Sequence, residues 1–308
     1  MAKTNVAIYL ETIRKKKKLS IAEATKGIIS DRQYRRYVLG ESEIPYHILA
    51  EISNNLGFTV EKILGESESL QRKQYEYVED IFNSIVRRNF ERTEELLKID
   101  SNQEFMSETI KLYFDVSMVL YDNYLEKLSK SEAKQKIYEL VNYPKILEQD
   151  IFDPVELIIL SVLTGYMEQS EKDPLINRLT DLLLEKKVTI GTEFYARQYI
   201  TIRLAREHFI NKNYQGTIDL CDNALLVSTR SKIHYNYDFL YYYIALAYQR
   251  LDNTLKAYEY LQKLYHYLLF IDEQIKFDSY TKKIKKDFGF KLSRVDHYLT
   301  LQKKNETV

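Results

Sequence analysis

The sequence contains few of the residues that cross-link, bend or interrupt a chain. Among 308 residues there are one cysteine, four prolines, eight glycines and no tryptophan. The single Cys221 excludes an internal disulfide framework and fits a reducing compartment, and we expect it to be a buried core thiol rather than a redox switch. The scarcity of proline and glycine favours long helices over short strands separated by turns. We therefore expect an all-α fold.

The chain also lacks the long apolar segments of membrane proteins and secreted precursors. Its N-terminus has no apolar signal region, and no stretch approaches the ~18 apolar residues of a membrane-spanning helix. Basic and acidic residues number 45 each, so the net charge is zero. With 29% charged and 45% hydrophobic residues the composition is that of a globular protein. We expect a cytoplasmic protein that does not contact a membrane.

Recognisable catalytic and metal-binding motifs are missing as well. The sequence contains no GxGxxG, no P-loop and no GxSxG elbow. None of the five histidines has the HExxH or Cys/His spacing of a metal site. These histidines are His47, His208, His234, His266 and His297. We therefore expect no enzyme activity, no catalytic residue, no cofactor and no metal.

Two short helices near the N-terminus are typical of a helix-turn-helix. Ser20 can cap a first helix that Gly27 ends, and Ser30 can cap a second helix that ends at Gly40. Short helices joined by a tight turn with glycine define this motif. One further helix before the pair and two after it would complete a five-helix domain.

The second helix of the pair has an arginine-rich outward face. Helical spacing places Tyr34, Tyr37 and Val38 toward the core. With the capping serine, the outward residues form the predicted DNA-binding set: Ser30, Asp31, Arg32, Gln33, Arg35 and Arg36. Arginine, glutamine and aspartate side chains can read base edges in the major groove of DNA. A solvated surface is the alternative, and for an isolated helix it is the commoner one.

The charge distribution favours the DNA-binding interpretation. Residues 1–40 contain ten Lys or Arg against three Asp or Glu, whereas residues 41–66 contain one Lys against five Glu. Because the whole chain is neutral, positive charge is concentrated where the arginine-rich helix lies. This distribution is expected of a surface that attracts backbone phosphates.

Around the helix pair the sequence resembles a known class of DNA-binding domains. The matching positions are Leu19-Ser20, the turn Gly27-Ile28-Ile29-Ser30, and the helix end Gly40-Glu41 followed by Ile44. They resemble the helix-turn-helix of the xenobiotic-response-element (XRE) class of repressors. The resemblance is closer to Rgg- and PrgX-type regulators, which belong to the peptide-pheromone-binding RRNPP group. It covers about 65 residues, and the assignment to this group also depends on chain length and the helical remainder.

The resemblance implies particular contacts. Base-edge contacts are expected at Asp31, Arg32 and Arg36, while Gln33 and Arg35 should contact phosphate or a neighbouring base. It also implies a homodimer on a pseudo-palindromic operator in double-stranded DNA. Two joined modules can read half-sites about one helical turn, ~34 Å, apart, whereas one small module makes few base contacts.

Two positions depart from the class. Many relatives have glutamine directly after the capping residue, for a phosphate contact, where this chain has Ile21. Many also have a glutamate two residues before the terminal glycine, paired with an arginine of the first helix. Here Val38 takes that place and Arg14 loses that partner. An apolar replacement of a structural ion pair can be neutral for stability.

The remainder of the chain is predicted to be a second helical domain. The polar Glu66-Ser67-Glu68-Ser69 predicts a hinge over residues 67–72, between a helix-turn-helix domain at 1–66 and a repeat domain at 73–308. Within the repeat domain, the pattern of a long helix, an asparagine-containing turn and a second helix occurs around Asn213 and again 40 residues later. This pattern is typical of a degenerate tetratricopeptide-like repeat. A third such turn is predicted near Asn89, and a generic helical bundle is the alternative.

Tyrosine is concentrated in the repeat domain. Fourteen of the 27 tyrosines lie between Tyr195 and Tyr280, and the consecutive Tyr241-Tyr242-Tyr243 cannot all face one core. Tyrosine suits a binding surface, amide side chains can hold an extended peptide backbone, and arginine can hold a carboxylate. We expect the short peptide ligand to contact Gln198, Tyr199, Arg203, Tyr235, Asn236 and Tyr242. Core and inter-repeat packing is the alternative for each of them.

Together these expectations describe a sequence-specific transcription regulator. Its repeat domain would supply the dimer contacts and bind a short signalling peptide of the quorum-sensing type that alters its activity, as the resemblance implies. One alternative is a ligand-independent phage or plasmid repressor with a helical oligomerisation domain. Another is a DNA-anchored adaptor whose repeats bind a protein.

Overall fold

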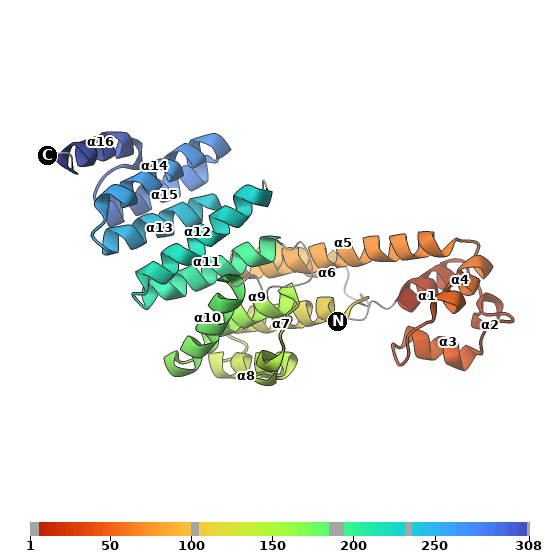
Figure 1. The fold of residues 1–308 in the computed structure, drawn as a ribbon. Helices are drawn as coiled ribbons and strands as arrows, with labels where there is room; N and C mark the ends of the chain where they lie inside the picture. Colours follow the sequence, from red (N-terminus) through yellow and green to blue (C-terminus); the bar gives the residue numbers. More distant parts are fainter. Residues whose placement is uncertain (1–5, 100–104, 185–193, 232–235, 307–308) are drawn as a thin grey trace. The chain divides into compact units, whose positions relative to one another are not determined.

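The computed structural model of the protein describes residues 6–99, 105–184, 194–231 and 236–306 (Figure 1). Within these ranges all regular secondary structure is helical, which confirms the predicted all-α class. The chain divides into two compact units, Met1–Tyr143 and Pro144–Val308. This division lies inside the segment 73–308 that the sequence predicts as a single repeat domain.

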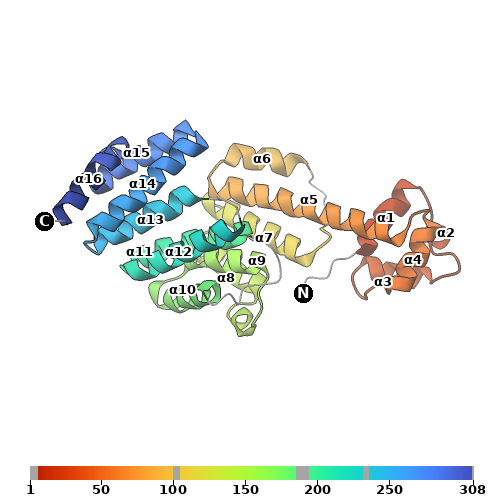
Figure 2. The same ribbon diagram turned by 45° about the horizontal axis from the view of Figure 1, so that its top comes forward.

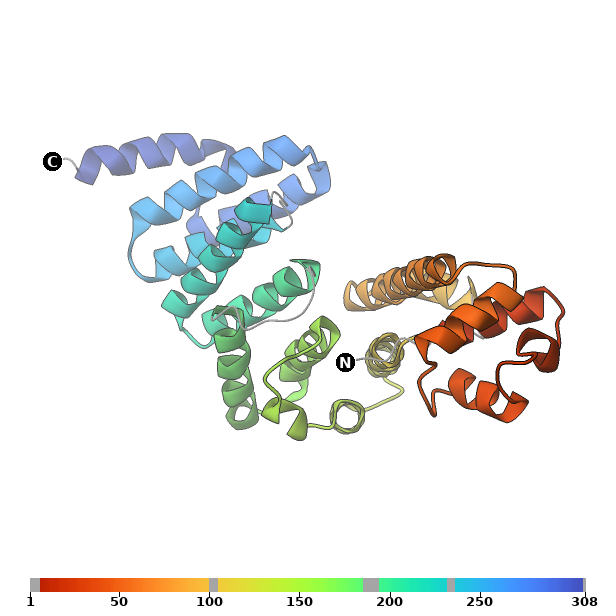
Figure 3. The same ribbon diagram turned by 45° about the vertical axis from the view of Figure 1, so that its right-hand side comes forward.

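The first unit begins with five helices around one small core. They are α1 (Val6–Lys16), α2 (Ile21–Ala24), α3 (Asp31–Val38), α4 (Tyr46–Asn55) and α5 (Val60–Val86). Leu10, Tyr34, Ile52 and Ile63, from four of these helices, are each at most 1% exposed and share this core. The four short helices gather around the first turns of α5, as Figure 1 and Figure 3 show. The predicted five-helix arrangement is therefore present.

Helix α5 continues without a break through residues 67–72, where the sequence predicts a hinge. The segment is polar but contains neither glycine nor proline, so nothing in it interrupts the hydrogen bonds of a helix. Ser67 is 1% exposed, which shows that tertiary packing covers this part of the helix. Beyond it, Val78, Ile81 and Phe82 are buried on the distal half of the same helix.

The distal half of α5 belongs to two helical hairpins that complete the first unit. Their other members are α6 (Phe90–Ile99), α7 (Glu108–Tyr124) and α8 (Lys130–Val141). Helix α6 packs on α5, and α7 packs on both α5 and α8. Phe82 of α5 and Tyr113 of α7 have ring centroids 5.0 Å apart in the buried interface.

The second unit consists of further helices that pack in sequence. They are α9 (Pro154–Leu163), α10 (Gln169–Leu184), α11 (Phe194–Ile210), α12 (Tyr214–Ser231), α13 (Tyr237–Arg250), α14 (Thr254–Ile271), α15 (Gln274–Phe288) and α16 (Val295–Glu306), with short 3-10 turns at Lys145–Glu148, Thr164–Tyr166 and Leu292–Arg294. Helices α11 to α14 lie side by side in Figure 2, with α12 packed against both α11 and α13. The two repeats predicted from the sequence are thus successive hairpins. No helix in the described ranges is long and apolar enough to cross a membrane.

The three predicted repeat turns share one backbone design. In each, a residue with positive φ precedes an asparagine, and the pairs are Arg88-Asn89, Lys212-Asn213 and Asp252-Asn253. Each asparagine Oδ1 accepts a hydrogen bond from the backbone N–H three residues later, at 2.9–3.2 Å. Each asparagine also donates its own N–H to a carbonyl five residues earlier. The turn therefore closes one helix in the manner of a Schellman motif and caps the next.

Candidate functional site

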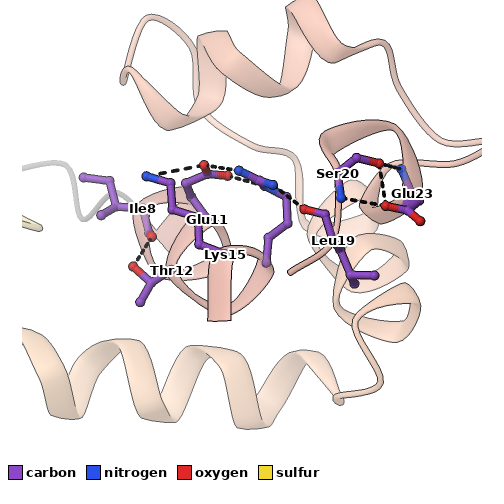
Figure 4. A network of polar contacts seen from close by, with 8 residues as sticks. Ile8, Glu11, Thr12, Lys15, Leu19, Ser20 and Glu23 are labelled. Carbon is purple, nitrogen blue, oxygen red and sulfur yellow. Dashed lines mark hydrogen bonds and ion pairs between the residues drawn. The ribbon is translucent and has the colours of Figure 1, made fainter. Parts of the chain in front are cut away.

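Serine caps position the helix-turn-helix pair. The Ser20 hydroxyl accepts a hydrogen bond from the Glu23 N–H at 3.1 Å, and the Glu23 carboxylate accepts one from the Ser20 N–H at 2.7 Å (Figure 4). The Ser30 hydroxyl accepts one from the Gln33 N–H at 3.3 Å. Gly27, in the turn between the helices, adopts a φ of 77°, which favours glycine. The caps satisfy N–H groups of the first helical turns and fix where α2 and α3 begin.

Helix α3 turns one face into the core and the other toward solvent. Tyr34 and Tyr37 are 1% and 7% exposed and anchor the inner face. Five of the six predicted DNA-binding residues are exposed: Ser30, Asp31, Arg32, Arg35 and Arg36. Gln33 is half-buried, and its Nε2 donates to Ser42 Oγ at 3.3 Å. The outer face therefore presents three guanidinium groups and one carboxylate.

One of these guanidinium groups has an acidic neighbour. Arg36 Nε lies 3.5 Å from Glu41 Oε2, and the two side chains are 48% and 55% exposed. Exposed pairs of this kind contribute about 0–1 kcal/mol because water and salt screen them. A phosphate or a base edge can therefore replace Glu41 at little cost.

An ion pair on α1 lies next to the core-facing side of the arginine-bearing helix α3. Arg14 donates to both carboxylate oxygens of Glu11, at 2.5 and 2.7 Å, and to the carbonyl of Leu19, just before α2. Burial raises the pKa of Glu11, but the hydrogen bonds and charge of Arg14 outweigh it and hold this pKa below its usual value. The neighbouring Tyr34 has a raised pKa because of its burial and the charge of Glu11. Arg14, which by the resemblance would pair with a glutamate at position 38, thus pairs with Glu11 instead.

Two residues of the predicted peptide site are committed to packing within the second unit. Gln198 is 1% exposed, and its Nε2 donates to Ser228 Oγ at 2.6 Å, which ties α11 to α12. Tyr242 is 8% exposed, and its hydroxyl donates to the Asp287 carboxylate on α15. Both polar groups therefore stabilise contacts between helices in this structure.

The structure brings Tyr199 and Arg203 together on α11. Arg203 donates from Nε to the carbonyl of Ser161 at 3.1 Å, and its guanidinium lies 5.8 Å from the centroid of the Tyr199 ring. Ser161 is in the last turn of α9, where carbonyl groups lack intrahelical partners and a cation is favoured. Arg203 therefore caps α9 through Nε and through Nη2, which donates to the carbonyl of Val162 at 3.5 Å, while Nη1 donates to the Tyr199 hydroxyl at 3.4 Å.

The other two predicted residues lie before α13. Tyr235 is outside the described residues. Asn236 is partly exposed and adopts a φ of 57°, and its side chain makes no capping hydrogen bond to α13. Its amide is thus placed at the start of the helix without a capping role.

Two residues that organise these sites, Glu11 and Ser161, are not among the site residues predicted from the sequence. Glu11 precedes Arg14 by three positions, a spacing that pairs side chains on a helix, and this signal was sufficient to predict the contact. Ser161 acts through its backbone carbonyl, so no side-chain pattern indicated it.

Comparison with known proteins identifies the fold. No family model and no curated protein matches the chain. Among solved structures, ComR from S. thermophilus in complex with DNA and its signalling peptide ComS is similar over 92% of this chain and 99% of its own, with a TM-score of 0.55 and 17% identity. A putative transcriptional regulator from Listeria monocytogenes EGD-e is similar over 92% of this chain and 97% of its own, with a TM-score of 0.54 and 16% identity.

A third structure agrees with these two. ComR from Streptococcus vestibularis in complex with its cognate signaling peptide XIP covers 92% of this chain and 99% of its own, with a TM-score of 0.53 and 17% identity. The chain thus has the fold of a helix-turn-helix domain followed by tetratricopeptide-like repeats. This confirms, at the level of fold, the resemblance to peptide-responsive regulators.

Proposed function

We propose that this protein is a sequence-specific transcription regulator of the RRNPP type, whose activity a short peptide controls. The observation that carries the proposal is the exposed arginine face of α3, on a helix that two buried tyrosines and a serine cap hold in place. The ComR structures with the same fold contain DNA and a signalling peptide in one case and a signalling peptide in another, which supports both halves of the proposal.

The chemistry of the α3 face suits the major groove. An arginine fork can donate to both O6 and N7 of guanine, so Arg32 and Arg36 are proposed to read base edges. The Asp31 carboxylate can accept from the amino group of cytosine. Ser30 and Arg35 are proposed to contact phosphates, which orient the helix and carry little sequence information. Gln33, held by Ser42, is the least available of the predicted set.

The regulatory half of the proposal assigns the peptide to the second unit. Tyr199 and Arg203 lie together on α11, and the partly exposed Asn236 precedes α13, so their aromatic, guanidinium and amide groups are proposed to contact the peptide. A peptide can shift the equilibrium between two states of the dimer only by the difference between its binding free energies for those states. The proposal therefore requires the peptide to bind the operator-bound and free dimers unequally.

The proposal can be tested by selecting the DNA sites that the protein binds and then adding peptide to the complexes. The full-length protein is used to enrich binding sites from random duplexes, and the enriched sites are titrated in a gel-shift assay. The proposal predicts a two-fold symmetric motif with half-sites one helical turn apart, and a change in the complex when peptides encoded near the gene are added. Enrichment of no motif would contradict the DNA-binding function. A motif whose binding no peptide alters would instead indicate a ligand-independent repressor.

A further inference from the structure

Helix α11 carries two arginines that differ in what they contact. Arg203 caps α9 through the carbonyl of Ser161 and lies against Tyr199. Arg206, three residues later, is exposed and makes no hydrogen bond or ion pair with any residue in the described ranges. Its neighbour Glu207 cannot neutralise it, because Glu207 is paired with Lys172 of α10. Arg206 is therefore an unengaged cation on the first helix of a repeat.

Helix α13 packs against α11 and carries aromatic side chains that reach it. Tyr243 stacks on Phe239, with ring centroids 4.2 Å apart, and meets Phe209 of α11 edge-on at 5.8 Å. Both rings of the stacked pair are only partly buried. Burial raises the pKa of the Tyr243 hydroxyl, and the charge of Arg206 opposes that rise, as expected for a nearby guanidinium. Arg206 lies three residues before Phe209 on α11, and Phe209 contacts Tyr243, so Arg206 and the Phe239–Tyr243 pair are neighbours across α11 and α13.

Two further charges border this surface from α15. Asp287 also acts on the Tyr243 hydroxyl, but its carboxylate accepts the hydrogen bond of Tyr242. The ammonium of Lys283 lies over the rings of Tyr242 and Tyr280, 5.6 and 4.5 Å from their centroids. Each of these charges already has a partner within the protein. Arg206 has no such partner among the described residues, so a ligand can bind it without displacing a protein group.

We propose that Arg206 binds the free C-terminal carboxylate of the peptide ligand, with an apolar or aromatic residue of that peptide packed on Phe239 and Tyr243. The assignment rests on the proposed peptide-binding function and specifies the ligand: a peptide with an unblocked acidic end. A guanidinium fork and a carboxylate pair through two parallel hydrogen bonds, which gives both direction and affinity. The aromatic pair supplies contact area with few rotatable bonds to immobilise.

The experiment compares two forms of each peptide against two forms of the protein. Synthetic heptapeptides rich in apolar residues are prepared with a C-terminal carboxylate and as the matched carboxamide. Their affinities for the full-length wild type and for Arg206→Ala are measured by isothermal titration calorimetry. The wild type should bind the acid form about tenfold to a hundredfold more tightly than the amide. Arg206→Ala should bind both forms with the affinity that the wild type has for the amide.

Control variants separate charge from folding. Arg230→Ala removes an exposed arginine from α12 and should retain the full preference for the acid form. Arg206→Lys keeps the charge but loses the fork, so it should retain part of the preference. A wild type that binds acid and amide equally, or a preference that survives Arg206→Ala, would overturn the assignment while leaving peptide binding intact. If no peptide binds in either form, both the assignment and the peptide half of the proposed function fail.

Discussion

Glu11 and Arg14 form a bidentate ion pair on α1, with donor–acceptor distances of 2.5 and 2.7 Å. Their side chains are 13% and 14% exposed, so water screens the pair only in part. The pair lies next to Tyr34, the residue that α3 buries most completely in the core. The orientation of the arginine-bearing helix therefore depends on a contact that involves none of its own charges.

Replacing Glu11 with glutamine should destabilise the helix-turn-helix domain by about 1–3 kcal/mol, because a largely buried guanidinium loses its charged partner. Urea unfolding of the variant measures this loss. In a double-mutant cycle, Arg14→Ala should cost much less in the Glu11→Ala background than in the wild type. The control is Lys15→Ala, which removes a 64% exposed amine 3.6 Å from Glu11 and should change stability by less than about 0.5 kcal/mol. Equal losses for Glu11→Gln and Lys15→Ala would contradict the role assigned to the pair.

The arginines of α3 give a prediction about sequence specificity. Arg32→Ala and Arg36→Ala should each weaken binding to the selected operator by about 1–3 kcal/mol and relax the base preference at one position. Arg35→Ala should weaken binding to all duplexes alike. It should also reduce the slope of log affinity against log salt concentration by about one. Fluorescence anisotropy at several salt concentrations measures both effects. Arg92→Ala, an exposed arginine of α6, is the control and should leave affinity and specificity unchanged. Retention of specific binding by the Arg32→Ala/Arg36→Ala double variant would reject α3 as the recognition helix.

Arg203 should prove to be a stabilising residue. Arg203→Ala removes a charged donor from the carbonyl end of α9 and should lower the free energy of unfolding by about 1–3 kcal/mol. Arg206→Ala, three residues later on an exposed position, should change stability by less than about 0.5 kcal/mol. Thermal and urea denaturation of the two variants compares them directly. Similar unfolding curves for the two variants would show that the contact between Arg203 and α9 does not stabilise the protein.

His208 gives the second unit a defined response to pH. Asn213 Oδ1 accepts from the Gly216 N–H, so its Nδ2 faces His208 Nδ1 as a donor at 3.0 Å. His208 Nδ1 must then accept, and Nε2 carries the proton toward Thr180 Oγ1 at 2.9 Å. Burial lowers the pKa of His208, and the charge of Glu207 opposes this only in part. The folded state therefore favours the neutral ring.

The sign of the pH effect follows from that lowered pKa. As the pH falls below about 6.5, the unfolded state takes up a proton that the folded state does not, so the free energy of unfolding should decrease. The decrease should level off below the folded pKa. Urea unfolding at pH 7.5 and pH 5.5 measures the loss, and His208→Gln should show a smaller one over the same interval. A His208 that titrates above pH 6.5 in the folded protein, as followed by NMR, would contradict the prediction.

Local sequence signals predicted the elements whose causes are local. Ser20, Ser30 and Gly27 indicated the ends of α2 and α3, because caps and positive φ values depend on residues only a few positions apart. The asparagine turns at Asn213 and Asn253 indicated the repeats for the same reason. In these regions the backbone conformation is determined by side chains that are close in sequence.

The structure adds what local signals do not carry, namely contacts between side chains that are distant in sequence. A polar stretch predicted a hinge at 67–72, but the same residues are compatible with helix, and tertiary packing buries Ser67. Gln198 looks like a ligand-binding amide in the sequence, yet its partner Ser228 is 30 residues away on the opposing helix. Hydrogen-bonding groups on a helix can serve a ligand or a neighbouring helix, and only the packing decides between them.

The unbroken course of α5 has a practical consequence. At 1.5 Å per residue its 27 residues form a rod about 40 Å long that joins the core of the helix-turn-helix to the first helical hairpins. A fragment ending at residue 66 would sever this rod after its second turn and leave Ile63 near a fraying end. Because Ile63 shares its core with Tyr34 of α3, such a truncation should loosen the packing that holds the arginine-bearing helix.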